Sequence, residues 1–299
     1  MVSVWLFLLT GCSVSSSAFD TDSRIVFSSE RTGLFQLYAM DDDGQNLVRL
    51  TSSTREERFP RSSPDGSRIV YQSIEGGSSD LFVMNADGTD VRQLTATGSE
   101  QTPSWTADGE WILHGSKRDG DQAIYRTRAD GTISMRVSRS ESAYDRFPAP
   151  SPDGRLIAYS CVQDGNEDLY VMNDDGSNPR RITTREELDS RPTWSADSKT
   201  LYFTSSFPGR SDEILSVRLD GSEPQGLTDR KSLSKEYVDR NVSSWGAVCS
   251  PGGEHLIFTT LRDGNAEVYI MSTDGNRARR LTDHPDADGM ASWMLNTMR

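Results

Sequence analysis

The sequence predicts an all-β fold, a six-bladed β-propeller built from four-stranded antiparallel blades. The first observation is an Asp-Gly pair, a strong signal for a hairpin turn, which recurs at intervals of 43 to 54 residues. The second is a short segment after each pair that ends in Leu-Thr or a near equivalent. Periods of about 40–45 residues with four strands per unit are typical of propeller blades. The six pairs begin at Asp43, Asp87, Asp130, Asp175, Asp220 and Asp274.

The most regular unit, residues 147–183, shows how one blade is expected to be built. Its inner turn, Ser-Pro-Asp-Gly at 151–154, suits a tight reversal because proline presets φ and glycine accepts a positive φ. Its outer hairpin turns at Asp175-Gly176. Segments before, between and after these turns predict four strands, at 147–150, 156–160, 168–173 and 180–183.

The two ends of the chain predict how the ring closes. Copies of the inner turn stand at 63–66, 106–109, 151–154, 195–198 and 250–253, one fewer than the number of outer hairpins. The first unit begins at Arg24, already in its second strand, and residues 288–293 align with the inner strand at 100–105. We therefore expect the last strand to pair beside the first blade, which removes the exposed edges of an open array.

Composition limits the classes of partner. A chain of 299 residues is within the size of one closed all-β domain, and 34% hydrophobic residues suit several thin sheets better than one large core. The formal net charge of −13 argues against a nucleic-acid or anionic-membrane surface, since phosphate binding needs positive charge. Cys161 and Cys249 fall in different repeats and are expected to be unpaired.

The N-terminal residues predict export. The apolar run Val4–Leu9 is too short to span a bilayer, and the string Leu-Thr-Gly-Cys that ends at Cys12 resembles a bacterial lipobox. We expect residues 1–11 to be a signal segment, Cys12 to be lipidated, 12–23 to be a serine-rich tether and 24–299 to be a single propeller domain. The alternative is a plain cleaved signal with a chance cysteine. Both place the protein outside the cytoplasm, in the periplasm or anchored to the outer membrane.

Several strings resemble those of the TolB-like propeller family, which is related to the WD-repeat propellers. The matching strings are 103–109 (PSWTADG), 192–195 (PTWS) and 169–173 (LYVMN), and the resemblance covers about Arg24 to Trp293. It implies the same six-bladed fold and an exported bacterial protein. For function it implies a binding module rather than a defined chemistry, because one fold carries many functions.

A carboxylate recurs three residues before the proline of the inner strands. Six-fold repetition would place these side chains around one mouth of the central channel. Together they could hold a hard cation such as Ca²⁺, which takes roughly 6–8 oxygen ligands, or attract a cationic peptide. The alternative is that each acid caps its own turn or pairs with a nearby arginine such as Arg58, Arg146 or Arg191. The ring positions are Glu57, Glu100, Asp145, Asp189, Ser244 and Asp288, five of them acidic.

One insertion interrupts the repeat, between Thr228 and Ser244. Long connections in compact folds are often functional, and this one is locally basic and aromatic beside the predicted acidic mouth. We expect it to contact a partner; the alternative is a solvated surface loop. The partner-binding candidates are Lys231, Lys235, Tyr237 and Arg240.

Motifs for catalysis are weak. Ser232–Lys235 matches Ser-x-x-Lys without a supporting motif, and nucleophile-elbow, dinucleotide, Walker and zinc-protease strings do not occur in the sequence. We therefore expect a monomeric, non-enzymatic propeller of the bacterial cell envelope that binds a protein or peptide at the channel mouth. Membrane contact is expected only through Cys12, and Ca²⁺ is the one cofactor considered. The alternative is a cation-dependent glycan lyase or hydrolase that uses the acidic ring.

Overall fold

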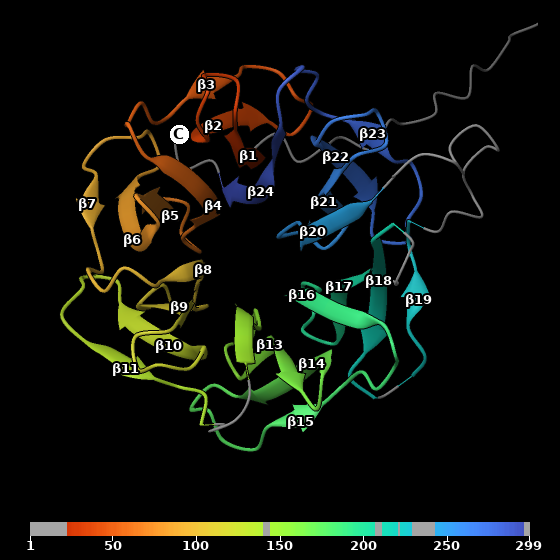
Figure 1. Ribbon diagram of the computed structural model, residues 1–299. Coiled ribbons are helices and arrows are strands. Elements are labelled where there is room, and N and C mark those ends of the chain that lie inside the picture. The colour runs from red at the N-terminus through yellow and green to blue at the C-terminus, as the bar shows by residue number, and fades with distance from the viewer. Residues whose placement is uncertain (1–22, 140–143, 207–210, 221, 229–242, 296–299) are drawn as a thin grey trace, which may run out of the picture.

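The computed structural model describes residues 23–139, 144–206, 211–220, 222–228 and 243–295. These residues form six four-stranded antiparallel sheets arranged around one axis (Figure 1). The predicted fold class, a six-bladed β-propeller, is confirmed. Among the described residues, no helix has the length and apolar character needed to cross a membrane.

Every blade contributes one strand to the channel and places the next three progressively further out (Figure 1). From the channel outward, the strands are β24 (Asp288–Leu295), β1 (Ser23–Ser29), β2 (Gln36–Asp41) and β3 (Val48–Arg49) in blade 1; β4 (Glu56–Ser62), β5 (Arg68–Glu75), β6 (Ser78–Asn85) and β7 (Arg92–Gln93) in blade 2; β8 (Gln101–Trp105), β9 (Trp111–Ser116), β10 (Ala123–Arg128) and β11 (Ser134–Arg136) in blade 3; β12 (Tyr144–Pro150), β13 (Leu156–Gln163), β14 (Asn166–Asn173) and β15 (Arg180–Arg181) in blade 4; β16 (Leu188–Trp194), β17 (Thr200–Ser206), β18 (Glu213–Arg218) and β19 (Gln225–Gly226) in blade 5; and β20 (Ser244–Cys249), β21 (His255–Thr260), β22 (Glu267–Ser272) and β23 (Arg279–Arg280) in blade 6.

The ring is closed by the last strand, as the sequence predicts. Strand β24 pairs antiparallel with β1, and Ile25 lies opposite Trp293. Blade 1 therefore combines the two ends of the described chain in one sheet.

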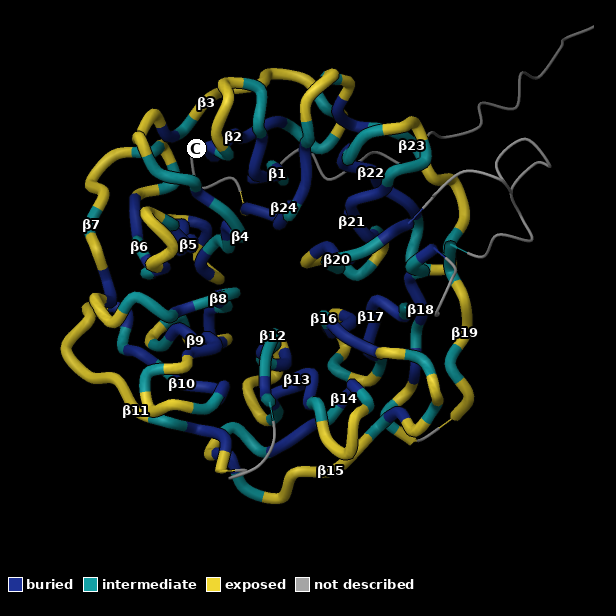
Figure 2. Tube along the Cα trace, viewed as in Figure 1, coloured by how far each residue is buried: buried dark blue, intermediate teal, exposed yellow. Residues whose placement is uncertain are grey.

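The apolar core is divided among the contacts between blades. Buried apolar side chains of the described residues form six clusters, and each cluster joins two neighbouring blades. Phe203 of β17, for example, packs with Leu169 of blade 4 and Trp194 of its own blade. Figure 2 shows the middle strands buried and much of the outer rim exposed. Thin sheets that share their cores in pairs explain why a low apolar content is sufficient.

Backbone contacts also link the blades. In the outer hairpin of blade 4, Gly176 has a φ of 82°, and a Cβ added there would lie 2.2 Å from the carbonyl oxygen of Val137 in blade 3. The repeated Asp-Gly pair therefore serves more than the turn, because its glycine lets the hairpin approach the preceding blade.

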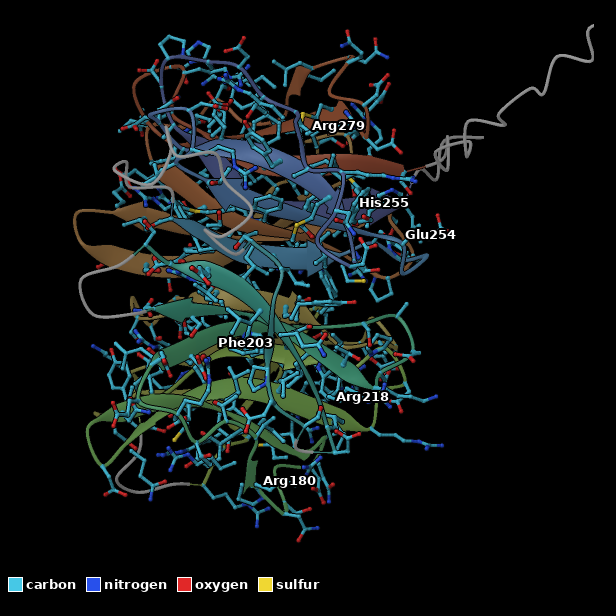
Figure 3. All side chains as sticks on the ribbon, turned by 90° about the vertical axis from the view of Figure 1, so that its right-hand side faces the viewer. Arg180, Phe203, Arg218, Glu254, His255 and Arg279 are labelled. Atoms are coloured by element: carbon cyan, nitrogen blue, oxygen red, sulfur yellow. The ribbon has the colours of Figure 1, made fainter. Side chains whose placement is uncertain are left out.

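The inner turns mark one flat face of the ring. In the edge-on view, Glu254, in the turn before β21, lies at this face, whereas Phe203 lies between the two faces (Figure 3). Each inner strand ends at its inner turn, so it begins at the opposite face. We call that opposite face the channel-mouth face. It is the face toward which the acidic ring was predicted.

Candidate functional site

A cavity of about 260 Å³ occupies the centre of the channel. All six inner strands, β4, β8, β12, β16, β20 and β24, contribute to its lining. A second cavity of about 390 Å³ lies toward the inner turns and shares Val248 and Cys249 with the first. The propeller axis therefore holds partly open space that side chains do not fill.

Each inner strand is interrupted by a β-bulge where it passes this cavity. In β4 the pairing with β5 shifts between Arg58 and Arg61, and Phe59 between them has a φ of 52°. The other five blades repeat the shift and the positive φ. Positive φ is uncommon for residues other than glycine and is a marked outlier for bulky ones. The six bulge residues are Phe59, Thr102, Phe147, Arg191, Gly246 and Met290.

Hydrogen bonds between blades hold three of the bulges. The backbone N–H of Arg191 donates to Ser160 Oγ of the preceding blade at 3.2 Å, and the N–H of Met290 donates to Thr259 Oγ1 at 3.1 Å. Gly246 makes the equivalent contact with Thr204 Oγ1 at 3.1 Å. Because these N–H groups point to the preceding blade, they no longer serve the ladder of their own sheet. The bulge thus exchanges a contact within one blade for a contact between blades.

Two layers of side chains line the central cavity. The first consists of the bulge residues, and the second of the residues two positions later, Arg61, Ser104, Ala149, Thr193 and Val248. Arg61 is the only long polar side chain among these five. Its Nη1 donates to the carbonyl oxygen of Pro60 at 2.9 Å, and loss of water contact lowers the pKa of its guanidinium to about 10.

Arg191 brings a second guanidinium to the same cavity from the bulge layer. Its Cζ lies 5.0 Å from the centroid of the Phe147 ring, and its Nε is buried without a hydrogen-bond partner. Burial, followed by the neighbouring charge of Arg146, lowers the pKa of Arg191. The sequence analysis did not predict the bulges. It therefore did not place the side chains of Arg61 and Arg191 in the channel.

The five predicted ring acids lie at the starts of the inner strands but do not face solvent. Their relative exposure is between 0 and 3%. Four of them lie directly opposite a hydroxyl or thiol of the next strand: Glu57 opposite Ser73, Asp145 opposite Cys161, Asp189 opposite Ser205 and Asp288 opposite Ser29.

Three of these acids pair with an arginine. The Nη2–carboxylate distance is 2.8 Å from Arg31 to Asp288, 2.9 Å from Arg118 to Glu100 and 2.7 Å from Arg185 to Asp189. The arginines considered from the sequence have other roles. Arg58 pairs with Glu56 at 2.8 Å, Arg146 pairs with Glu167 at 2.6 Å, and Arg191 lines the channel.

The remaining two acids interact with neutral groups through one carboxylate oxygen, while Glu57 Oε2 and Asp145 Oδ1 are buried without a hydrogen-bond partner. Glu57 Oε1 accepts a hydrogen bond from Ser53 Oγ at 2.7 Å, and Asp145 interacts with Ser138 and Cys161. Burial raises the pKa of Glu57, Asp145 and Asp189. The acids are thus held separately, each by its own set of neighbouring groups.

A cation at this ring stays a prediction that the geometry does not favour. Within residues 23–139, 144–206, 211–220, 222–228 and 243–295, no group of three or more His, Cys, Asp or Glu side chains could hold a metal ion. A cation-dependent glycan lyase or hydrolase therefore gains no support. Lys231, Lys235, Tyr237 and Arg240, the partner-binding candidates, and Cys12, the predicted lipidation site, lie outside the described residues.

Comparison with known proteins identifies relatives over much of the chain. A family model described as "TolB beta propeller domain" matches residues 56–147 and 143–248, together more than half of the chain. "Protein TolB homolog" of Chlorobaculum tepidum is 36% identical over 133 residues, which is 44% of this chain and 29% of the relative. "Tol-Pal system protein TolB" of Desulfosudis oleivorans is 32% identical over 120 residues, 40% of this chain and 27% of that protein. The matched segments thus span less than a third of these curated relatives.

Solved structures share the fold. TolB from Acinetobacter baumannii superimposes with a TM-score of 0.77 at 21% identity and covers 92% of this chain and 67% of its own. A putative TolB from Agrobacterium tumefaciens gives a TM-score of 0.68 at 22% identity, covering 92% of this chain and 98% of its own. At these identities the likeness concerns the fold alone.

Proposed function

Because the chain belongs to the TolB beta-propeller domain family, we propose that it is a non-enzymatic binding module of the bacterial cell envelope. Its partner is a protein or peptide, bound at the channel-mouth face. The observation that carries the proposal is the family match over 56–147 and 143–248. One relative is named as a Tol-Pal system protein, which supports a role in an envelope protein assembly.

The outer edges of the blades favour binding at a flat face. The outermost strands β3, β7, β15, β19 and β23 have two residues each, and β11 has three. Such short edges offer few free backbone groups for a partner strand to pair with. A partner is therefore recognised mainly by side chains at the faces. The insertion between Thr228 and Ser244 joins β19 to β20 and leads to the channel-mouth face, because β20 begins there.

Capture of the partner tests this proposal. The tagged full chain is incubated with envelope extract of its own bacterium, and retained proteins are identified by mass spectrometry. We expect a defined partner to be retained by the native chain and lost when Lys231, Lys235, Tyr237 and Arg240 are replaced by serine. The matched control replaces Arg155 and Lys199, which lie beside the inner turns on the opposite face, and should retain the partner. Retention by every variant, or no retained partner at all, would contradict the proposal.

Export and a lipid anchor complete the proposal. The Leu-Thr-Gly-Cys string ending at Cys12 supports both, and relatives bearing the TolB name support an exported protein. Replacing Cys12 by alanine should abolish incorporation of labelled palmitate, whereas Cys249→Ala should not. Equal labelling of both variants would exclude the anchor. We propose that the protein acts as a monomer, because its own last strand completes blade 1 and closes the ring.

A further inference from the structure

Two guanidinium groups share the central cavity without an acidic partner. Arg61 bonds only to the carbonyl oxygen of the preceding residue, and Arg191 has a buried Nε that makes no hydrogen bond. Among the described residues, neither arginine has a carboxylate oxygen within 4.0 Å. Arginines close by differ in this respect, since Arg58 and Arg146 are both ion-paired. The lack of an ion pair therefore distinguishes Arg61 and Arg191 from Arg58 and Arg146.

The charge balance makes this pair unusual. The chain carries a formal net charge of −13, yet the carboxylates nearest the channel are committed to other groups. A guanidinium that has lost water is costly unless an anion is supplied. Both arginines are half-buried, and this burial lowers their pKa values. A bound anion would supply the missing partner, and a carboxylate matches the planar donor fork of arginine.

The other walls of the cavity define the rest of the ligand. Phe59, Phe147, Trp245 and Met290 provide apolar surface from four different blades. The layer that contains Arg61 otherwise has small side chains, which leaves space beside its guanidinium. Left-handed bulge residues such as Phe59 and Phe147 carry backbone strain of the kind that gathers at binding sites. A volume of about 260 Å³ lies just below the roughly 300–1,000 Å³ of sites for drug-sized ligands.

We propose that the centre of the channel is a binding site for a small carboxylic acid with an apolar body. Arg61 and Arg191 supply the positive charge for its carboxylate from blades 2 and 5, and the aromatic and methionine side chains of the bulge layer contact its body. The site takes a free small acid, and none of its described lining residues belongs to the insertion. Replacement of Lys231, Lys235, Tyr237 and Arg240 therefore leaves it intact, and its failure does not bear on partner capture.

Calorimetric titration tests the proposal with phenylacetate as the probe. Phenylacetamide has nearly the same shape without the charge and should bind at least about tenfold more weakly, because a hydrogen bond to a charged group is worth about 1.5–3 kcal/mol, which is tenfold or more in affinity. Arg61→Gln and Arg191→Gln should each weaken phenylacetate binding by a similar factor. Ala149→Leu retains both charges but reduces the cavity, and should also weaken it.

Arg58→Gln is the matched control, because this residue lies on the same strand as Arg61 but is paired with Glu56. It should leave phenylacetate binding unchanged, and circular dichroism shows whether each variant is folded. The proposal is overturned if the native protein does not bind phenylacetate, or if phenylacetamide binds equally well. It is also overturned if inorganic phosphate, or a tripeptide with a free C-terminal phenylalanine, binds while phenylacetate does not.

Discussion

At the scale of single residues, buried polar groups determine how the protein responds to pH. His114 of β9 is fully buried, and its Nε2 lies 2.9 Å from Thr127 Oγ1. Loss of water contact, then the nearby charge of Arg118, lowers the pKa of His114 from 6.5 to about 3. The unfolded chain therefore binds a proton at this position in mildly acid solution while the folded chain does not. The stabilisation is complete above pH 6.5 and is lost as the pH falls from there toward 3.

We expect His114 to cost the protein about 2 kcal/mol of its free energy of unfolding between pH 6.5 and pH 5, since one pH unit is worth about 1.4 kcal/mol. His114→Gln keeps a side chain that can bond to Thr127 and removes the titration. Urea unfolding at both pH values should show a smaller loss for this variant than for the native protein. His255→Gln, at a partly exposed position, is the control and should keep the native loss. Equal losses in all three proteins would exclude His114 as the cause.

At the scale of elements, the outer hairpin of blade 4 is packed closely against the blade before it. Gly176, in the hairpin between β14 and β15, approaches the carbonyl oxygen of Val137. Gly165, in the hairpin between β13 and β14, has a similar φ of 85° but no atom within 4 Å of an added Cβ. Substitution of Gly165 therefore measures the free-energy cost of a left-handed backbone alone. Substitution of Gly176 adds the cost of a steric clash with Val137.

Gly165→Ala should lower the free energy of unfolding by about 1 kcal/mol, the cost of the left-handed conformation alone. Gly176→Ala should lower it by roughly 3 kcal/mol or more, because the added methyl group meets backbone that cannot move aside. Chemical denaturation of the two variants measures the difference. If both variants lose the same stability, the contact between the hairpin and Val137 is not tight.

The repeat predicted the strands and turns well, because turn residues such as Pro152 and Gly176 are recognisable in the sequence. The channel lining was harder to predict, because a bulge breaks the period-two alternation of a strand. In a regular strand, simple alternation would show which side of the sheet the side chains of Phe147 and Ala149 face. The bulge at Phe147 removes that regularity. The proline after Phe59, Thr102, Phe147 and Arg191 was a usable signal, since the second bulge position needs no ladder donor. Pairing of Asp189 with Arg185 depended on a loop geometry that the pattern does not encode.

At the scale of the whole molecule, stability depends on closure of the ring. Strand β24 supplies the inner strand of blade 1 and contributes Ala291 and Trp293 to the core shared with blade 6. Trp293 Nε1 also donates to the carbonyl oxygen of Val248 at 3.0 Å. Loss of this strand would expose apolar surface on two blades and leave β1 as a free edge.

A chain that ends before Asp288 should therefore melt far below the native protein, by roughly 10 °C or more, if it folds at all. Thermal unfolding followed by circular dichroism gives the comparison. Removal of residues 1–22, which precede the first strand, is the control and should change the melting temperature little. A truncated chain that melts within a few degrees of the native protein would show that closure contributes little to stability.

The seam between the two ends has a mechanical consequence. Ser23 pairs with Leu295, so both ends of the described chain leave the ring at the same end of one strand pair. Tension applied between them would break the β1–β24 hydrogen bonds sequentially, starting at the Ser23–Leu295 end. It would not load all of these bonds at once. A propeller held at its N-terminal side and pulled at the other end would open at this seam before any other blade is stretched. The strand pair that completes the ring is therefore also its weakest point under load.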